Sequence, residues 1–519
     1  QLRQMTAQVT WLPSRRKLHG SGGGACRMAP LRAHATCAQM WRNCRRAEGH
    51  SRSSRVRHLT GTVGIGNLST TSGSGLRLSS GRPLVSVSTQ LQRYAVRALG
   101  RLGGHPFLAD KRRRAQFGRW LGSGAHRGVE AQQAVGRAFA KRTGSVRPVR
   151  PHPTEDHGVF DLTPTDDQAM LRDAAKELAT NVLRPAASAA DSARGIPPEV
   201  AAAGDAMGLH LVGVPTTLDG IAESGTAVTA ALVLEELAHG DLGLTVALMG
   251  TASVATALSL YGTPAQQATY LPHLTAEQPM VAALATQEPQ PLFDATTPRT
   301  NATREGDELV VTGTKALVAR VAEAELFVIS VTHEEAARLL IVEANTPGLT
   351  IEDEPAMGVR AAATGRLVLT DARVPAANLL GSADDHLDAL RRSRVAWSAL
   401  AVGTVRAVLD QVSGYVTERH AFGEPVAHRQ SVAFMVANIA IDLDAMRLAT
   451  WRAAALLDAG QDAREAVAHA RTLTSVHAPR IGSDGVQLLG GHGFVKEFDN
   501  ERWYRDLRGA GMIEGVVLA

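Results

Sequence analysis

The chain has 519 residues, 44% of them hydrophobic and 4% aromatic, which is enough for two to four domains with substantial cores. Its formal net charge of +5 hides an uneven distribution: residues 1–155 hold 28 Lys and Arg against 4 Asp and Glu, whereas residues 156–519 hold 27 against 46. The basic part lacks the interleaved aromatic residues of a nucleic-acid module, no apolar run has the length of a membrane span, and no cysteine after Cys44 is available for a disulfide framework or a thiolate metal site.

The first 155 residues divide into two basic segments. Residues 1–84 are rich in Arg, Ser and Gly and lack apolar periodicity, which predicts a disordered extension without a function of its own. A mitochondrial transit peptide shares this composition, but the segment is long for one and lacks an amphipathic start. Residues 85–155 are interpreted as a basic helical arm and linker. The arm either lies on a partner subunit or an anionic surface, or is simply solvated.

Residues 156–278 predict an N-terminal all-helical domain. Thr163, followed by Pro164 and acidic residues, indicates a helix start with Thr163 as the N-cap, and the helical period continues to Leu183. Prolines at positions 185, 197 and 198 indicate breaks. Further helices are predicted at 198–208, 227–239, 253–260 and 264–274.

Residues 279–385 predict a middle β domain, and residues 386–519 predict a return to long helices. The strands are expected at 308–313, 326–331, 339–342, 349–352 and 367–369. The run 326–331 is almost entirely apolar, which is typical of a strand buried on both faces. The later helices are expected at 387–415, 429–459 and 462–477. This order of helices, strands and helices indicates a mixed α and β fold.

Residues 487–515 combine a glycine-rich turn with a carboxylate. Gly490, Gly491 and Gly493 form a turn that suits close approach of a flat or anionic ligand to the backbone. A charged helix follows, and the segment ends at Glu514 and Gly515, where a carboxylate in an apolar run is a candidate general base. A helix–turn–helix corner with a solvated glutamate explains the same local pattern, so these residues alone leave both interpretations open.

Several motifs, in order, resemble the acyl-CoA dehydrogenase family over about residues 160–519. The sequence RHAFGEP begins at Arg419, QLLGGHGF begins at Gln487, and Glu514 stands eight residues after Asp506. Shorter matching stretches lie at 211–215, 234–238, 270–274, 357–358, 364–365 and 373–381. The resemblance implies an N-terminal helical domain, a middle β-barrel-like domain and a C-terminal four-helix bundle.

The resemblance also implies FAD-dependent α,β-dehydrogenation of an acyl-CoA thioester. In that family a glutamate removes the acidic α-proton while the β-hydrogen leaves as hydride to flavin N5. By this resemblance Glu514 falls at the position of the base, eight residues after Asp506, whereas the alternative position used by some members holds Ser393, which cannot serve. Arg394 and Gly515 are implied to neighbour the substrate. The residues implied to contact FAD, partly across a subunit boundary, are Arg419, Phe422, Gln430, Gln487, Gly490 and Gly491.

Partners and location follow from the same resemblance and from composition. The family implies a homodimer or homotetramer that takes an acyl-CoA substrate, with an electron-transfer flavoprotein as a candidate electron acceptor. Neither nucleic acid nor a transmembrane segment is expected. The Ala-rich, Lys-poor composition favours the bacterial cytoplasm over the mitochondrial matrix.

The chain departs from the family pattern around the flavin ring. Leu292 and Phe293 replace a Gly-Ser pair, Leu317 replaces an aromatic residue, Ala319 replaces Ser or Thr, and Val516 replaces Thr. Each hydrogen bond lost at a buried polar edge costs about 1–3 kcal/mol. These substitutions favour an alternative to the dehydrogenase, a non-catalytic subunit that binds acyl-CoA or an active paralogue. A related enzyme, an acyl-CoA oxidase whose reduced flavin meets dioxygen, is a further alternative that the sequence leaves open.

Overall fold

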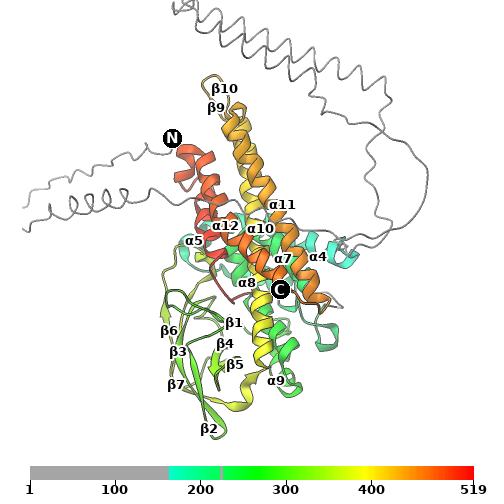
Figure 1. Ribbon diagram of the computed structural model, residues 1–519, viewed down its shortest axis with the longest axis vertical. Helices are drawn as coiled ribbons and strands as arrows, with labels where there is room; N and C mark the ends of the chain where they lie inside the picture. The colour runs from blue at the N-terminus through cyan, green and yellow to red at the C-terminus, as the bar shows by residue number, and fades with distance from the viewer. Residues whose placement is uncertain (1–162, 223–225) are drawn as a thin grey trace, which may run out of the picture. The chain divides into compact units, whose positions relative to one another are not determined.

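The computed structural model describes residues 163–222 and 226–519, and Figure 1 shows how their helices and strands are arranged. The extension expected at residues 1–84 and the basic arm expected at 85–155 lie outside the described residues. Along the described chain, a group of helices, a β sheet and a second group of helices follow one another. This order confirms the mixed α and β fold class, with helical domains on either side of a central sheet domain.

The first helical domain comprises the helices that precede the sheet. They are α4 (Asp166–Leu178), α5 (Arg184–Ala193), α6 (Pro198–Ala206), α7 (Thr226–Gly240), α8 (Leu242–Tyr261) and α9 (Pro264–Leu274). The predictions at 198–208, 227–239 and 264–274 are confirmed to within about two residues. The prediction at 253–260 covers only the second half of α8, because the Asp241 carboxylate caps the helix further upstream by accepting the Leu244 N–H at 2.9 Å.

The predicted helix start at Thr163 is wrong, because Thr165 is the N-cap. Thr165 Oγ1 accepts the Gln168 N–H at 3.2 Å, and Gln168 Oε1 accepts the Thr165 N–H at 3.1 Å. This reciprocal capping box satisfies two backbone donors, which a start at Thr163 would not. The predicted break at Pro185 is also wrong. A π-helical turn, Ala179–Leu183, connects α4 to α5, and Pro185 lies in the first turn of α5, where its missing N–H is tolerated.

Helix α8 is the most apolar helix of this domain. Within residues 163–222 and 226–519 it is the one helix long and apolar enough to cross a membrane, although no such span was expected from the sequence. In the folded chain 94% of the apolar stretch of α8 is buried, so α8 is a core helix of the fold.

The central domain is an eight-stranded sheet in the order β6-β7-β3-β2-β4-β5-β8, with β1 pairing in parallel with β4. The strands are β1 (Ala282–Ala285), β2 (Asn301–Glu305), β3 (Glu308–Val318), β4 (Leu326–His333), β5 (Ala336–Glu343), β6 (Leu349–Asp353), β7 (Gly365–Pro375) and β8 (Leu379–Leu380). Each predicted strand is present, and β4 is buried on both faces as expected. Both halves of the sheet contribute to one apolar cluster, which includes Val311, Phe327 and Leu367.

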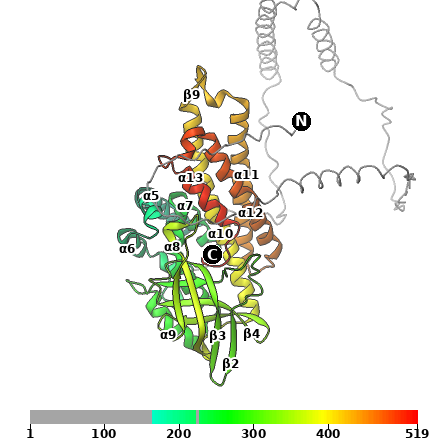
Figure 2. The same ribbon diagram turned by 90° about the vertical axis from the view of Figure 1, so that its left-hand side faces the viewer.

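The C-terminal helical domain lies above the sheet in Figure 2. Its α-helices are α10 (Ala383–Glu418), α11 (Gln430–Asp458), α12 (Arg464–Leu488) and α13 (Asn500–Ala510), and the hairpin β9 (His420–Ala421) and β10 (Glu424–Pro425) connects α10 to α11. The predicted end of a helix at residue 477 is wrong, since α12 continues through Pro479 to Leu488. Packing of α12 against α10, α11 and α13 outweighs the one hydrogen bond that a proline cannot make.

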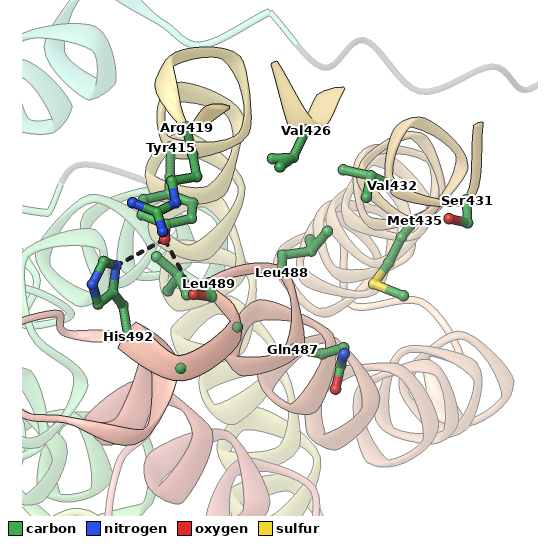
Figure 3. Close-up of a pocket in the computed structure, with 12 residues that line it drawn as sticks. Tyr415, Arg419, Val426, Ser431, Val432, Met435, Gln487, Leu488, Leu489 and His492 are labelled. Carbon is green, nitrogen blue, oxygen red and sulfur yellow. Dashed lines mark hydrogen bonds between the residues drawn. The ribbon is translucent and has the colours of Figure 1, made fainter. Parts of the chain in front are cut away.

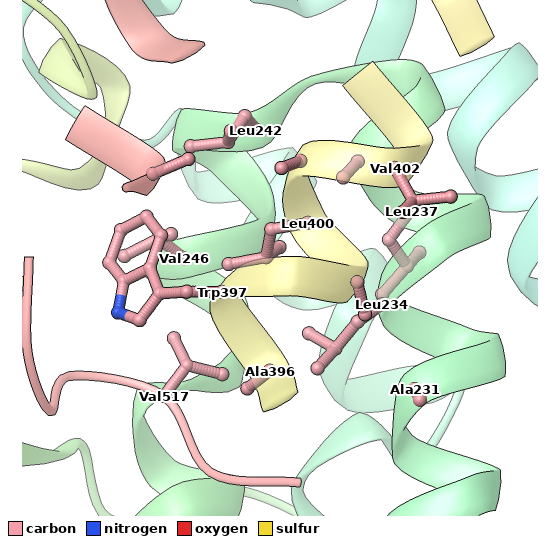
Figure 4. Packing of buried hydrophobic residues seen from close by; sticks show 14 of the residues in the cluster. Ala231, Leu234, Leu237, Leu242, Val246, Ala396, Trp397, Leu400, Val402 and Val517 are labelled. Atoms are coloured by element: carbon pink, nitrogen blue, oxygen red, sulfur yellow. The ribbon is translucent and has the colours of Figure 1, made fainter. Parts of the chain in front are cut away.

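The largest apolar core lies where α7, α8 and α10 meet. Trp397 of α10 is completely buried, and Figure 4 shows its ring beside Val246 of α8 and Val517. Leu234 of α7 and Leu400 of α10 belong to the same cluster. Burial of a ring of this size contributes about 4–6 kcal/mol. Because Trp397 follows Ser393 and Arg394 by about one helical turn, this core also fixes the part of α10 that reaches Glu514.

A buried group of charges connects α13 to α8 and to the loop before β7. Arg502 Nε lies 2.9 Å from Asp241 Oδ2, and Asp506 Oδ1 accepts the Val359 N–H at 2.6 Å. Burial, together with the nearby Asp241 charge, raises the pKa of Asp506 to about 7. Burial also raises the pKa of Asp241, but Asp241 has Arg502 beside it.

This pKa difference predicts how stability depends on pH. Between pH 3.8 and about 7, Asp506 is protonated in the folded chain and ionised in the unfolded chain. The contribution of this raised pKa to the free energy of unfolding is fully present below pH 3.8. It is lost as the pH rises to about 7, at about 1.4 kcal/mol per pH unit. Asp506→Asn keeps an acceptor for Val359 and should remove this slope. Urea unfolding at several pH values tests it, with the exposed Asp444→Asn as control. Equal slopes in wild type and Asp506→Asn would contradict the assignment.

Candidate active site

Glu514 lies four residues after the end of α13 and is held by two arginines. Its Oε2 lies 3.0 Å from Arg394 Nε on α10, and its Oε1 lies 3.4 Å from Arg471 Nη2 on α12. The Glu514 side chain is only 13% exposed, so it is not the solvated glutamate that its local sequence also allowed. Two helices far apart in the sequence thus direct guanidinium groups at one carboxylate.

The backbone around Glu514 is anchored by the sheet domain and by α10. Gln287 Oε1 accepts the Glu514 N–H at 3.1 Å. The Gly515 carbonyl accepts from Ser393 Oγ at 2.9 Å and from Trp397 Nε1 at 2.8 Å. Gly515 has a φ of +72°, and a Cβ there would lie 2.4 Å from the Thr286 side chain, so only glycine fits. The site is therefore built where the sheet domain meets the C-terminal helices.

The residues after Gly515 run into the core rather than over the surface. Val516, Val517, Leu518 and Ala519 are all buried. The Leu518 N–H donates to Ser253 Oγ of α8 at 3.0 Å, and the Ala519 carbonyl accepts from Arg392 at 3.1 Å. This packing holds the far side of the Glu514 segment against α8 and α10.

A buried ion pair stabilises the loop that carries Gln287. Glu288 accepts hydrogen bonds from Thr300 and lies 2.7 Å from Lys315 Nζ on β3, and both charged side chains are buried. Burial alone would raise the pKa of the Glu288 carboxyl, but Lys315 and the hydrogen bonds lower it to about 2. Burial lowers the pKa of Lys315 to about 8. The pair thus stays ionised at neutral pH and connects the loop to the sheet.

A cavity of about 400 Å³ lies at the C-terminal end of α12, and Figure 3 shows the side chains that line it. The Tyr415 hydroxyl lies 2.8 Å from His492 Nδ1 and donates to the Leu489 carbonyl at 3.2 Å. Gly490 has a φ of +59°, and a Cβ on Gly490 or Gly491 would meet no atom within 4 Å. The remaining lining residues are Arg419, Val426, Ser431, Val432, Met435, Gln487 and Leu488.

The structure brings four of the six predicted cofactor contacts together at this cavity. Arg419, Gln487, Gly490 and Gly491 line it. Phe422 and Gln430 are not among the lining residues. Phe422 forms the exposed turn between β9 and β10, 97% exposed with a φ of +58°, and Gln430 is the exposed first residue of α11. Both therefore lie outside this cavity, on the surface of the chain.

The side chains that depart from the family pattern occupy well-defined places. Leu292 is fully exposed with a φ of +55°, and Leu317 has a φ of +53°. The Leu317 N–H donates to Glu354 Oε2 at 2.6 Å, so that donor is already used within the chain. Ala319 is buried and packs in the helical core. None of these three side chains provides a hydrogen-bonding group.

Comparison with known proteins identifies the class to which this fold and site belong. Residues 165–278, 283–372 and 385–516 match the N-terminal, middle and C-terminal domains of acyl-CoA dehydrogenase. The chain therefore belongs to the acyl-CoA dehydrogenase family. The family predicted from the sequence motifs is confirmed.

Individual relatives agree with this assignment. The chain is 32% identical to a probable acyl-CoA dehydrogenase of Bacillus subtilis, over 69% of this chain and 98% of the relative. It is 33% identical to a cyclohex-1-ene-1-carbonyl-CoA dehydrogenase of Geobacter metallireducens, over 66% and 93%. The solved butyryl-CoA dehydrogenase of Megasphaera elsdenii superimposes with a TM-score of 0.62 at 26% identity, over 68% of this chain and 95% of that one.

Membership confirms FAD as the cofactor and an oxidoreductase that acts on the CH–CH bond of an acyl-CoA. The cavity at the end of α12 fits part of this cofactor. Gly490 and Gly491 leave open backbone beside the Arg419 guanidinium, and this combination suits an anionic group such as the phosphates of FAD.

A side chain at Gly491 should fill this glycine turn and weaken FAD binding. A hydrogen bond to a charged group is worth about 1.5–3 kcal/mol, so Gly491→Val should weaken binding at least about tenfold. Titration of the apoprotein with FAD, followed by flavin fluorescence, measures the effect. Gly195→Val is the matched control, because a Cβ there also meets no atom within 4 Å. Unchanged affinity of Gly491→Val would place the cofactor elsewhere.

Proposed function

We propose that the chain catalyses α,β-dehydrogenation of an acyl-CoA thioester with Glu514 as the general base. The observation that carries the proposal is the position of Glu514, a mostly buried carboxylate at the junction of the sheet domain and the C-terminal helices. Family membership supports the reaction class. The identity of the base and the acyl group belong to the proposal.

Glu514 would take the α-proton of the thioester onto a carboxylate oxygen. Protonated Glu514 would be neutral, so the Arg394 and Arg471 guanidinium groups would lose the negative charge that they share. Arg394 is 31% exposed and contacts Glu514 only through its side chain, whereas Arg471 is 12% exposed. We therefore assign Arg394 to the substrate side, where it can leave Glu514 as the acyl group enters. Gly515 keeps the base in place through its carbonyl contacts. FAD, when bound, supplies the acceptor for the β-hydrogen and its electron pair.

The electron acceptor is a separate question at the same site. An acyl-CoA oxidase, whose reduced flavin meets dioxygen, differs from the dehydrogenase in that acceptor. The absence of hydrogen-bonding side chains at Leu292, Leu317 and Ala319 favours a different second candidate, a non-catalytic subunit that binds acyl-CoA or an active paralogue. An electron-transfer flavoprotein stays the predicted acceptor for the dehydrogenase. The bacterial cytoplasm stays the predicted location.

Anaerobic reduction of the flavoprotein by butyryl-CoA and octanoyl-CoA tests the proposal. Wild type should show an oxidised flavin spectrum that bleaches, and Glu514→Gln should keep the flavin but bleach at least about 10²-fold more slowly, as expected for loss of a general base. The control is Glu497→Gln, an exposed glutamate in the loop before α13. Bleaching of Glu514→Gln at the wild-type rate would exclude Glu514 as the base.

Protein that takes up no FAD would indicate the non-catalytic subunit. Reoxidation by air as fast as by electron-transfer flavoprotein would indicate the oxidase.

We also propose that the chain assembles as a homodimer or homotetramer. Phe434, Ile441 and Leu448 recur every seventh residue along α11 and are each more than half exposed, which gives an apolar stripe along one face of the helix.

Ile441→Glu places a charge in this stripe and should dissociate the assembly, which sedimentation equilibrium would show as a lower mass. Ile351→Glu, at an exposed isoleucine of β6, should not. An unchanged mass for Ile441→Glu would exclude α11 as the interface.

A further inference from the structure

Arg471 makes more contacts with the Glu514 segment than an ion pair requires. Its Nη1 donates to the Ala510 carbonyl at 2.7 Å, and its Nη2 donates to the Ile513 carbonyl at 2.7 Å. The same Nη2 lies 3.4 Å from Glu514 Oε1. One guanidinium group thus holds the end of α13, the residue before Glu514 and the Glu514 carboxylate. A planar fork with donors in fixed directions can do this, and a point charge cannot.

The segment that Arg471 holds has little structure of its own. Helix α13 ends at Ala510, after which the Met512 and Ile513 N–H groups donate to the Gly509 carbonyl in one further turn, and the Ala510 carbonyl accepts from Arg471. Gly509, Gly511 and Gly515 lie within the seven residues around Glu514, and glycine leaves the backbone conformationally free. A Cβ on Gly511 would lie 2.5 Å from Ser475 Cα, one helical turn after Arg471, so α12 packs directly against this segment. The position of the carboxylate therefore depends on contacts from outside the segment.

Arg471 and Arg394 differ in what they contact. Arg394 donates from Nε to both Glu514 carboxylate oxygens, at 3.2 and 3.0 Å. Arg471 is more buried and contacts the backbone on both sides of Gly511 as well as the carboxylate. Burial lowers the pKa of Arg471, opposed by the Glu514 charge. Removal of Arg394 would free the side chain of Glu514, whereas removal of Arg471 would also free the backbone that carries it.

We propose that Arg471 is the positioning residue for Glu514. It acts by joining the glycine-rich segment after α13 to the rigid helix α12, so that the carboxylate is presented in one place when the acyl group arrives. The inference rests on the proposed role of Glu514 as base. Because Arg471 acts through Glu514, it should affect the rate of proton removal rather than the binding of acyl-CoA or FAD.

The test compares Arg471→Met and Arg471→Lys with wild type. Arg471→Met should slow flavin bleaching by butyryl-CoA roughly tenfold to hundredfold, the size of effect that misplacement of a reacting group by about 1 Å produces. The dissociation constant for butyryl-CoA and the flavin content should change by less than about threefold, because neither ligand is bound through Arg471. Arg471→Lys restores the charge beside Glu514 but not the double contact with the Ala510 and Ile513 carbonyls, so it should recover only part of the rate.

A second measurement needs no substrate. Amide hydrogen exchange of the peptide that contains residues 511–517 should speed up in Arg471→Met protein free of acyl-CoA, while exchange of α10 and α11 stays as in wild type. The matched control is Arg480→Met, which removes another arginine of α12 that is ion-paired to Asp442 on α11. It should leave both the bleaching rate and exchange at 511–517 unchanged.

The outcomes separate this inference from the function on which it rests. Slow bleaching with fast exchange at 511–517, and with ligand binding retained, supports Arg471 as the positioning residue. Bleaching of Arg471→Met at the wild-type rate overturns the inference. Full recovery of the rate in Arg471→Lys also overturns it, because the charge alone would then explain the loss. General loss of melting temperature and flavin content would make Arg471 merely structural and also overturns it. If instead Glu514→Gln bleaches like wild type, the proposed base fails, whatever the exchange measurement shows about the segment.

Discussion

The position of Glu514 depends on hydrogen bonds between the segment after α13 and three other parts of the chain. Gln287 of the sheet domain holds the Glu514 N–H, Ser393 and Trp397 of α10 hold the Gly515 carbonyl, and Arg471 of α12 holds the carbonyls before Glu514. A glycine-rich segment without regular structure cannot maintain one conformation by itself, because each free backbone residue costs about 1–2 kcal/mol of entropy to fix. The helices and the sheet must therefore assemble before this carboxylate has a defined place.

Helix α12 connects the two sites of the chain. Arg471 contacts the Glu514 segment, and Gln487, sixteen residues later, lines the cavity with the glycine turn. At 1.5 Å per residue these two positions are about 24 Å apart along one helix. A continuous helix packed on three neighbours is stiff, so the spacing between the base and the glycine turn is a property of α12. Continuation of α12 through Pro479 is what keeps the two sites in one rigid frame.

Buried ion pairs also fix the parts around Glu514, one within the sheet domain and one between the two helical domains. The Glu288–Lys315 pair connects the loop of Gln287 to β3, and the Asp241–Arg502 pair connects α8 to α13. Such pairs contribute little net stability, because desolvation offsets their attraction, but each partner left alone would be strongly unfavourable. The Asp241–Arg502 pair therefore favours one arrangement of the two helical domains, and the Glu288–Lys315 pair favours one position of the Gln287 loop on the sheet. That selectivity matters for a site whose parts come from separate domains.

The sequence alone determined the fold class, the family and the base candidate. Long helical periods, the apolar run of β4 and the motifs from Arg419, Gln487 and Glu514 are local patterns, and local patterns survive without knowledge of the tertiary structure. The errors at Thr163 and Pro185 were also local, since capping by Gln168 and a π-helical turn overrode residue preferences. The predicted helix end at residue 477 failed for a tertiary reason, since packing carries α12 through Pro479.

Only the tertiary structure decided what surrounds Glu514. Arg471 and Trp397 belong to no short motif, and their contacts with residues 510–515 span 39 to 118 positions of sequence. Likewise, the sequence grouped six residues as cofactor contacts, but chain folding placed four of them at one cavity and left Phe422 and Gln430 exposed. Contacts between distant segments depend on how helices pack, and packing is set by the whole core rather than by any stretch of sequence.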